Sequence, residues 1–384
     1  MRIAYVYPQF AHQAGTERIL IDKMNYLAEH YGYDIVMVTN EQGTHPVAFP
    51  LSPKVEHVDL DVRFFPLYRH NYLVRYIKWI MLEIRLQKRY NAFMAQWKPD
   101  IVVATTYFAN IISLINHCPT PSLHILESHI DKRFILNNDP VNRKSLLRWL
   151  HMISDMRRVE RNARQFNMLV ALNHSDATEW SQFLPTTVIS NIVHLNTTGR
   201  YSQYDQPRVI FVGRYTEQKG IANLFRVWTI VNQRHPDWHL DLYGEGNLQE
   251  WMEEEVRRSP RNIHIHPPTH SIFDCYCQSS ILVLTSVYEP FGLVMPEAMS
   301  CGLPVVAFNC PSGPASIITD GVDGFLVDNG DYLCFADCVC QLIDDHNLCR
   351  QMGQRAIAAA QRYHEQNIMP QWKDLFEHLN AQSS

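Results

Sequence analysis

The sequence predicts an α/β protein with two doubly wound parallel sheets. Short apolar runs alternate with longer amphipathic segments, and this rhythm starts again at about residue 208. Runs that are apolar throughout are typical of parallel strands buried on both faces. Charge divides the chain as well: residues 1–200 hold 22 Lys and Arg against 17 Asp and Glu, whereas the remainder holds 12 against 22. Both observations indicate two domains.

The elements follow in order along each half. In the first half, strands are expected at 2–7, 34–39, 100–104, 122–126 and 168–171, with helices at 16–30, 70–96, 107–117 and 139–164. In the second half, strands are expected at 208–212, 239–243, 262–265, 280–284, 304–307 and 324–327, with helices at 220–235, 247–258, 293–301, 331–345 and 348–362. The domains are therefore placed at 1–196 and 208–363, joined by a polar linker at 197–207 and followed by a last helix within 364–384.

Composition also gives predictions about membrane insertion, cellular compartment and metal binding. No run of 18 apolar residues predicts a transmembrane helix, and the first residues read as a strand, not a secretory signal. Nine cysteines, an odd number, favour a reduced, cytoplasmic protein. Cys334, Cys338 and Cys340 could hold zinc, but they lack paired C-x2-C spacing, so buried thiols are the favoured interpretation and no metal site is predicted.

Three loops that follow predicted strands carry residues suited to binding phosphate groups or sugar hydroxyls. Gly15 precedes a helix, where backbone N–H groups can meet a phosphate. Arg214 and Lys219 share one loop and suit a diphosphate, although solvated surface charges are equally compatible. Glu289 and Glu297 lie among apolar neighbours, and a carboxylate can accept two hydrogen bonds from vicinal hydroxyls. The G-x-G-x-x-G pattern of NAD enzymes is absent.

These motifs together resemble the retaining glycosyltransferases of family 4. The resemblance rests on Gly15–Thr16–Glu17, Gly213–Arg214 with Lys219–Gly220, and the run from Glu289 to Val306. The match continues through Cys310–Pro311–Ser312–Gly313–Pro314. Within the family, the sequence resembles a branch of bacterial transferases that build surface polysaccharide and lipopolysaccharide. The resemblance implies the GT-B fold, in which two Rossmann-like domains face a central cleft and a C-terminal helix packs back on the N-terminal domain.

The resemblance also implies roles for individual residues. Gly15, Arg214 and Lys219 would meet the diphosphate of a nucleotide-sugar donor, Glu289 would hold hydroxyls of the transferred sugar, and Glu297 would bind the ribose. Phe291, Gly292 and Leu293 would line the sugar and phosphate pocket, while Gly213 and the loop from Tyr243 and Gly244 would lie beside the donor. His129 would lie near the transferred sugar, although a histidine after a strand is more often structural.

Two positions depart from the family pattern, and one motif competes with it. Ala14 replaces a glycine of the first loop, and Ala315–Ser316 breaks the G-P-x-E pattern. Asp59–Leu60–Asp61 could suggest a metal-bound diphosphate, but it follows an apolar strand pattern and reads as strand-end polar residues. Two cations and helix dipoles can replace a metal, so the predicted reaction needs neither a metal nor a cofactor.

The predicted function is transfer of a hexose or N-acetylhexosamine from a UDP-linked donor to a lipid-linked or polysaccharide acceptor. The anomeric configuration of the sugar would be retained. Basic segments 63–98 and 143–164, with net charges of +7 and +5, interleave Tyr and Trp and favour a peripheral position on an anionic membrane over a plain solvated face; nucleic acid is disfavoured. A sugar-nucleotide epimerase, a phosphorylase and a non-catalytic sugar-binding protein are the alternatives.

Overall fold

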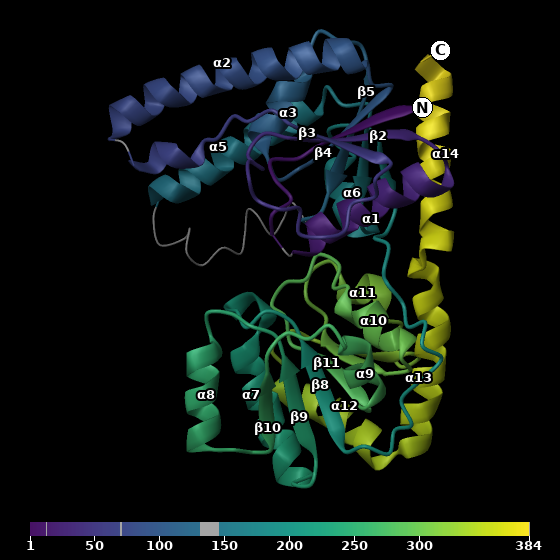
Figure 1. The fold of residues 1–384 in the computed structure, drawn as a ribbon. Coiled ribbons are helices and arrows are strands. Elements are labelled where there is room, and N and C mark those ends of the chain that lie inside the picture. The colour runs from purple at the N-terminus through teal and green to yellow at the C-terminus, as the bar shows by residue number, and fades with distance from the viewer. Residues whose placement is uncertain (13, 70, 131–145, 384) are drawn as a thin grey trace. The chain divides into compact units, whose positions relative to one another are not determined.

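The computed structural model describes residues 1–12, 14–69, 71–130 and 146–383. Contacts divide the chain into an N-terminal unit, Met1–Ile192 with Ile368–Ser384, and a C-terminal unit, Val193–Asn367. Each unit is built around one parallel sheet, and Figure 1 shows both as ribbons. The last helix, α14 (Glu365–Ser383), begins in the C-terminal unit and continues in the N-terminal unit.

The N-terminal sheet has the strand order β3-β2-β1-β4-β5-β6-β7, with every neighbouring pair parallel. Its strands are β1 (Arg2–Val6), β2 (Asp34–Thr39), β3 (Val55–Asp59), β4 (Ile101–Thr105), β5 (Leu123–Ser128), β6 (Met168–Ala171) and β7 (Thr186–Val188). Its helices are α1 (Gly15–His30), α2 (Tyr72–Trp97), α3 (Ala109–Asn116), α5 (Leu146–Ala163) and α6 (His174–Trp180). Strand order reverses between β1 and β4, which is where open α/β sheets bind ligands.

Two apolar layers cover the faces of this sheet. Ile3 and Tyr5 of β1 belong to one layer, together with α1 and the Trp372 side of α14. Ala4 and Val6 belong to the other, together with residues of α2, α3 and α5. Because successive side chains of a strand point to opposite faces and both faces are covered, β1 is apolar from Ile3 to Val6.

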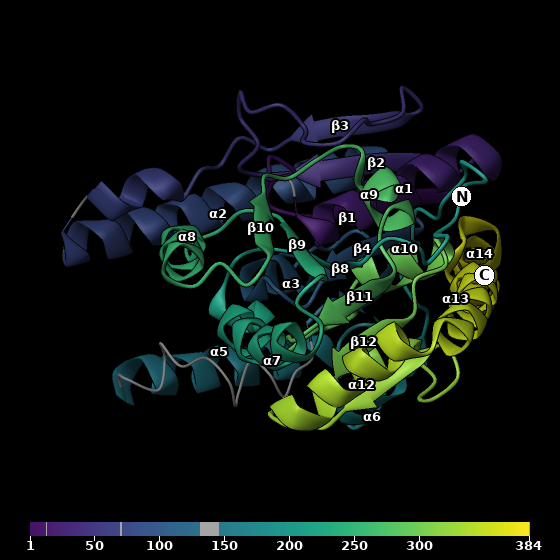
Figure 2. The same ribbon diagram turned by 90° about the horizontal axis from the view of Figure 1, so that it is seen from below.

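The C-terminal sheet has the order β10-β9-β8-β11-β12-β13 and is also parallel throughout. Its strands are β8 (Arg208–Val212), β9 (His239–Tyr243), β10 (Ile263–His266), β11 (Ile281–Leu284), β12 (Val305–Phe308) and β13 (Gly324–Val327). Its helices are α7 (Ile221–Arg234), α8 (Gln249–Arg258), α9 (Ile272–Cys277), α10 (Val294–Ser300), α11 (Pro314–Ile317), α12 (Tyr332–Asp344) and α13 (His346–Ala360). Helix α7 packs with α12, and α10 packs with α13, on either side of the sheet (Figure 2).

The segment expected as a linker, 197–207, lies within the C-terminal unit, and the chain crosses between units earlier, after Ile192. Ser202 N–H donates to the Cys301 carbonyl at 2.9 Å, and the buried Tyr204 hydroxyl donates to the Gly302 carbonyl at 2.8 Å. Tyr204 is a buried aromatic residue inside a polar stretch. Segment 197–207 therefore packs within the C-terminal unit, whereas its polar composition predicted a linker.

Two further findings bear on the sequence predictions. Among the described residues, no helix combines the length and apolar character needed to cross a bilayer. The start of the helix expected at 139–164 lies outside the described residues, as do Arg143 and Lys144. Helix α5 covers the described remainder of that segment.

Candidate functional site

The candidate residues fall into two sets, one in each unit. Gly15 and His129 belong to the N-terminal unit, and the others belong to the C-terminal unit. In the C-terminal unit, β8 and β11 are neighbours, and the strand order reverses between them. The loops that leave their carboxyl ends carry Arg214, Lys219 and Glu289, so the topology itself brings the two predicted loops together.

The two loops touch at Gly220. This residue caps α7 in the left-handed region, with φ +66°, and the Thr285 hydroxyl donates to its carbonyl oxygen at 3.0 Å. A Cβ atom placed on Gly220 would lie 1.9 Å from the Thr285 carbonyl oxygen. Only glycine fits this contact, and the contact fixes how closely the β8 loop approaches the β11 loop.

Lys219 and Glu289 form an ion pair between these loops. Lys219 Nζ donates to Glu289 Oε2, and the two side chains are 13% and 7% exposed. The Ser286 hydroxyl donates to the same carboxylate oxygen at 3.3 Å, and the Glu289 carbonyl accepts from Gly313 N–H at 2.7 Å. Glu289 is therefore held at both its main chain and its side chain.

The surroundings of Glu289 are apolar enough to affect a neighbouring thiol. Burial, together with the nearby Glu289 carboxylate, raises the pKa of Cys310 to about 12. Gly292 follows Glu289 in the left-handed region, with φ +88°, and a Cβ there would lie 2.9 Å from Glu289 Cγ. The loop thus folds tightly around the carboxylate, which leaves no room for a side chain at position 292.

Arg214 is exposed and, within the part of the chain that the structure describes, has no ion-pair partner. Its neighbour Gly213 donates its N–H to the Tyr243 carbonyl at 3.0 Å. A Cβ on Gly244 would meet the Gly213 carbonyl oxygen at 2.0 Å. The structure thus brings Gly213, Tyr243 and Gly244 together at the ends of β8 and β9, with an available cation next to them.

Residues 291–297 form the entrance and first turn of α10. Phe291 is buried and packs edge-on against Tyr363, with ring centroids 5.4 Å apart, so its side chain supports the loop from inside. Leu293 is the half-buried N-cap residue. Glu297 is 7% exposed, and one of its oxygens accepts from the Tyr276 hydroxyl at 3.5 Å. Burial and this carboxylate raise the pKa of Tyr276 well above its usual value.

In the N-terminal unit, Gly15 is the exposed first residue of α1. Ala14 is the N-cap residue and offers no side-chain hydrogen bond to the first turn. Because Ala14 does not cap them, the N–H groups of that turn can meet an anion. Replacement of a glycine by Ala14 leaves this property intact.

The Asp59–Leu60–Asp61 motif has structural partners. Asp59, the last residue of β3, accepts from the Thr39 hydroxyl at 3.1 Å and from Gly43 N–H at 2.8 Å. Asp61 pairs with Arg63 at 3.1 Å. Across the described residues, no group of three or more His, Cys, Asp or Glu side chains is arranged to hold a metal ion. Both aspartates therefore serve the end of the strand.

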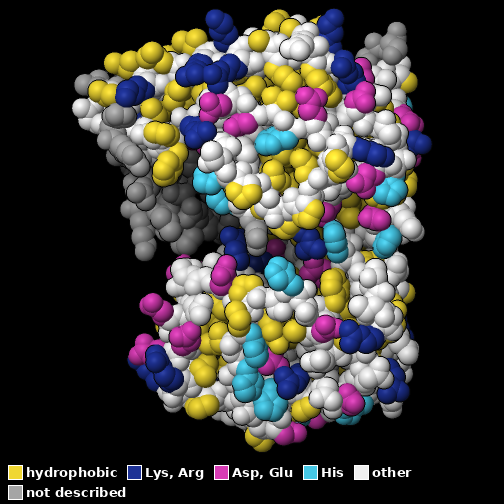
Figure 3. Space-filling model, viewed as in Figure 1, with side chains coloured by type: hydrophobic (Ala, Val, Ile, Leu, Met, Phe, Trp, Pro, Cys, Tyr) yellow, Lys and Arg dark blue, Asp and Glu magenta, His cyan; other side chains and the backbone are white. Residues whose placement is uncertain are grey.

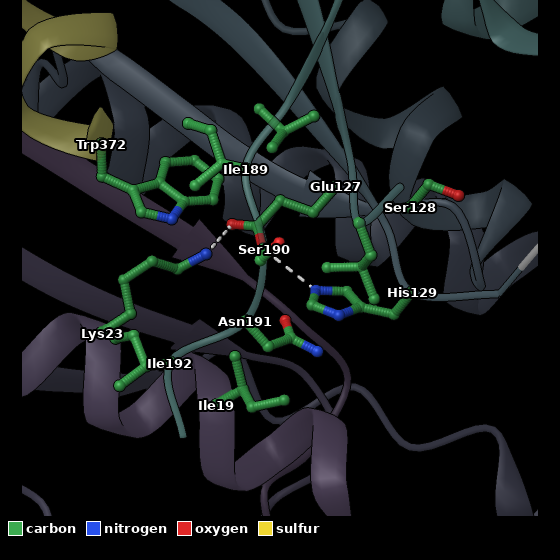
Figure 4. A pocket seen from close by; sticks show the side chains of 12 residues that line it. Ile19, Lys23, Glu127, Ser128, His129, Ile189, Ser190, Asn191, Ile192 and Trp372 are labelled. Atoms are coloured by element: carbon green, nitrogen blue, oxygen red, sulfur yellow. Dashed lines mark hydrogen bonds and ion pairs between the residues drawn. The ribbon is translucent and has the colours of Figure 1, made fainter. Parts of the chain in front are cut away.

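His129 follows β5 and is 5% exposed. Its Nε2 lies 3.0 Å from Glu127 Oε2, and the other carboxylate oxygen of Glu127 accepts from Lys23 Nζ at 2.5 Å (Figure 4). Lys23 comes from α1, and its ammonium lies 3.7 Å from the centroid of the Trp372 ring on α14. Sequence reasoning missed Lys23 and Glu127, because 104 residues separate them and neither belongs to a local motif.

Comparison with known proteins agrees with this geometry. Residues 206–345 match the family described as glycosyl transferases group 1. An uncharacterised glycosyltransferase of Haemophilus influenzae is 24% identical over 379 residues, covering 97% of this chain and 99% of that protein. The amylovoran biosynthesis glycosyltransferase AmsD of Erwinia amylovora is 31% identical over 192 residues, which cover 49% of this chain and 54% of AmsD.

The crystal structure of a point mutant of S. aureus TarM, in complex with Fondaparinux, alpha-GlcNAc-glycerol and UDP, superposes with a TM-score of 0.77. The match covers 98% of this chain and 99% of that one, at 15% identity. The fold is GT-B. The resemblance to glycosyltransferases predicted from the loop motifs is confirmed, and the matched segment contains the β8 loop, the β11 loop and α10.

Proposed function

We propose that this chain is a retaining glycosyltransferase that moves a hexose or N-acetylhexosamine from a nucleotide sugar, UDP-linked, to a surface-glycan acceptor. The observation that carries the proposal is the largely buried ion pair of Lys219 with Glu289, which joins the loops after β8 and β11 at the point where strand order reverses. The family match over 206–345 covers both loops. The name of AmsD, an amylovoran biosynthesis glycosyltransferase, supports the acceptor class, and the UDP in the TarM complex supports the donor base.

The chemistry follows from the charges. When a sugar nucleotide transfers its sugar, negative charge grows on the leaving diphosphate and positive charge grows on the anomeric carbon. Arg214 and Lys219 would stabilise the diphosphate, and removal of one such preorganised donor typically costs a factor of about 100 to 1,000 in rate. In the structure Lys219 is paired with Glu289. Donor binding would let Lys219 turn to a phosphate oxygen while Glu289 accepts from sugar hydroxyls.

The other residues keep the roles that the resemblance implied. Glu297 would bind the ribose hydroxyls, and Tyr243 and Gly244 would lie beside the base. The N-terminal unit would supply Gly15 to the diphosphate and His129 to the transferred sugar. The attack would occur on the face that the diphosphate leaves, with a phosphate oxygen taking the acceptor proton, and no metal or cofactor would take part.

A sugar-nucleotide panel tests this proposal. The wild-type protein is incubated with UDP-, GDP- and ADP-linked sugars, with and without EDTA, in the presence of a lipid-linked saccharide acceptor. We expect transfer from a UDP-sugar that EDTA does not change, with the anomeric configuration of the donor kept in the product, as read by NMR coupling constants. Interconversion of the sugar without nucleotide release would indicate an epimerase, and binding without turnover would indicate a non-catalytic protein.

A glycine in the β11 loop provides a second test. Gly292→Ala forces a side chain into the left-handed region and places it 2.6 Å from Met295 Cε, beside Glu289. We expect at least tenfold slower transfer, because the loop must shift. Gly330→Ala is the matched control, since Gly330 has φ +94° but no atom within 4 Å of the added Cβ. Equal losses in the two variants would show that backbone strain alone, of about 1–2 kcal/mol, is responsible.

We also propose that α2 docks the protein on an anionic membrane. Four apolar side chains on α2 are between 55% and 65% exposed, namely those of Tyr76, Ile77, Met81 and Ile84. The last three follow i, i+4, i+7 spacing, which places them on one stripe of the helix. The exposed Lys78, Arg85 and Lys88 lie along the same stretch, and Figure 3 shows hydrophobic and cationic side chains interleaved over α2.

Arg89 and Trp97, in the second half of α2, have partners within the N-terminal unit. Arg89 donates to the Leu60 carbonyl at 2.5 Å and to the Asp61 carbonyl at 2.8 Å. Trp97 donates to Glu56 at 3.1 Å, and Arg2 stacks on its ring at 5.0 Å. The proposed docking surface is therefore the stretch of α2 from Tyr76 to Lys88 and not the whole segment.

Flotation with liposomes tests the docking surface. We expect the protein to float with vesicles that contain phosphatidylglycerol, at about 1 kcal/mol per cation near the surface, and to remain behind with pure phosphatidylcholine. Ile77→Ser, Met81→Ser and Ile84→Ser together should abolish flotation. The matched control is Leu333→Ser, which removes a 63% exposed leucine from α12 of the other unit. Flotation that survives the triple change, or that Leu333→Ser removes equally, would contradict the proposal.

A further inference from the structure

The buried network behind His129 has a composition that packing alone does not require. Lys23 is 1% exposed, Glu127 is 2% exposed, and His129 is 5% exposed. Burying charges costs free energy unless they are paired and hydrogen-bonded. Three apolar side chains of similar volume would fill the same space at a lower cost in free energy. Each charge here has a partner, so the network has a defined geometry.

The space around the network is too small for a ligand of its own. The pocket lined by Lys23, Glu127, His129, Asn191 and Trp372 has an accessible volume of about 10 Å³, which is enough for roughly one water molecule. Figure 4 shows these side chains converging from α1, β5, the loop after β5, the 189–192 segment and α14. The network therefore does not bind a ligand of its own, and its effect is on the orientation and protonation of His129.

Glu127 determines which nitrogen of His129 carries a proton. An ionised carboxylate only accepts hydrogen bonds, so Nε2, which lies 3.0 Å from Glu127 Oε2, must be the protonated nitrogen. Burial alone would raise the pKa of Glu127, but the Lys23 ammonium and His129 hold it below its usual value. Glu127 thus stays ionised, and in the neutral imidazole Nδ1 is left as a hydrogen-bond acceptor.

The ring is fixed in place as well as in tautomer. Ser128 donates to the Ile130 carbonyl at 3.1 Å, and Tyr107 donates to the His129 carbonyl at 3.5 Å, which hold the loop after β5. In Figure 4 the Nδ1 edge of the ring is turned away from Glu127. The ring therefore presents Nε2 to Glu127 and directs Nδ1 away from it.

We propose that Glu127 and Lys23 are positioning residues that commit His129 to the Nε2–H tautomer and present Nδ1 as an acceptor to a hydroxyl group of the transferred sugar. A carboxylate that orients a histidine in this way works through the histidine and does not touch the substrate. The proposal rests on the proposed function for the identity of the hydroxyl. It does not depend on that function for the tautomer.

Long-range ¹H–¹⁵N NMR of the imidazole groups tests the tautomer without turnover. We expect the Nε2–H pattern for His129 in the wild type and a mixture of tautomers in Glu127→Gln, because an amide can donate to Nε2 as well as accept from it. His129→Ala assigns the signal. His124, which lies on β5, is the internal control: it pairs with Ser122 at 3.1 Å, burial lowers its pKa to about 4, and its signal should not change.

A double-mutant cycle tests the effect on catalysis. Transfer from UDP-glucose or UDP-N-acetylglucosamine, whichever the wild type uses, is measured for Glu127→Gln, His129→Ala and the double variant. We expect Glu127→Gln to lower kcat about tenfold with the donor KM within twofold, and to have less than a twofold further effect once His129 is alanine. If Glu127→Gln fails to fold, Lys23→Met with Glu127→Gln removes both buried charges and is used in its place, with the same expectations.

Two outcomes would overturn the proposal. These are an unchanged His129 tautomer in the Glu127 variants, or losses of kcat that multiply fully in the double variant. If no sugar nucleotide is turned over by the wild type, the proposed function fails, while the NMR measurement still decides whether Glu127 sets the tautomer.

Discussion

Lys219→Met is expected to lower the rate of sugar transfer roughly 100- to 1,000-fold, the usual cost of removing one preorganised donor to a developing negative charge. The methionine keeps the length of the side chain and removes its charge. It also leaves Glu289, which is 7% exposed, without its cation. Some of the loss will therefore reflect a rearranged Glu289, and a second variant is needed to isolate the diphosphate contribution.

Arg214→Met isolates that contribution. Arg214 is exposed and has no ion-pair partner among the described residues, so its removal should leave the melting temperature unchanged while transfer slows by a similar factor. Arg234→Met is the matched control, since Arg234 is a cation of the same unit that pairs with Asp337 on the surface. Initial rates at saturating donor measure the effect. If Arg214→Met keeps full activity, or if Arg234→Met loses as much activity as Arg214→Met, the β8 loop is not part of the site.

Lys23→Met is expected to destabilise the N-terminal unit by about 3–5 kcal/mol, because it leaves the Glu127 carboxylate buried and unpaired. Lys373→Met is the control. Lys373 pairs with Glu377 at 3.9 Å and lies over the Tyr31 ring, but it is 42% exposed, and such surface pairs are worth about 0–1 kcal/mol. Adding Glu127→Gln to Lys23→Met should recover most of the loss. Hydrogen exchange of the β5 amides reports opening of this unit specifically.

The same variant should show a characteristic pH dependence. In the wild type the pKa of Glu127 is lowered, so its stabilising contribution is present above the unfolded-state pKa and is lost as pH falls through the folded-state pKa. Without Lys23, burial should raise the pKa of Glu127 above its unfolded value. The destabilisation by Lys23→Met should then be smaller at pH 5 than at pH 8. A loss that does not vary with pH would mean that the lost packing against Trp372 is responsible, and not the unpaired carboxylate.

The sequence predicted the central strands closely, because they are apolar at nearly every position. Strands β1, β2, β8, β9 and β12 begin and end within one residue of the expected ranges. The edge strands β3 and β7 were missed. In β3 only Val55 is buried, and β7 is three half-buried residues, so neither has the uniform burial that marks a strand of this sheet.

The meeting of the Lys219 and Glu289 loops could be predicted because both residues lie in loops with strong local patterns. Glu289 and Lys219 are 70 residues apart, but each follows a strand of the same switch point, so topology links them. Lys23 and Glu127 could not be predicted in this way. A lysine on an amphipathic helix reads as part of its polar face, and only the three-dimensional packing of Trp372 and β5 shows that this one is buried.

We have proposed that the loops after β8 and β11 hold a nucleotide sugar through Lys219 and Glu289. The most direct measurement is the rate of nucleoside diphosphate release from UDP-sugars by the wild type and by Glu289→Gln, with UDP binding measured in parallel by calorimetry. We predict release by the wild type, at least 100-fold slower release by Glu289→Gln, and UDP affinity within a few-fold of the wild type, since the proposal places Glu289 on the sugar and not on the nucleotide. Equal rates of release by the two proteins would contradict the account.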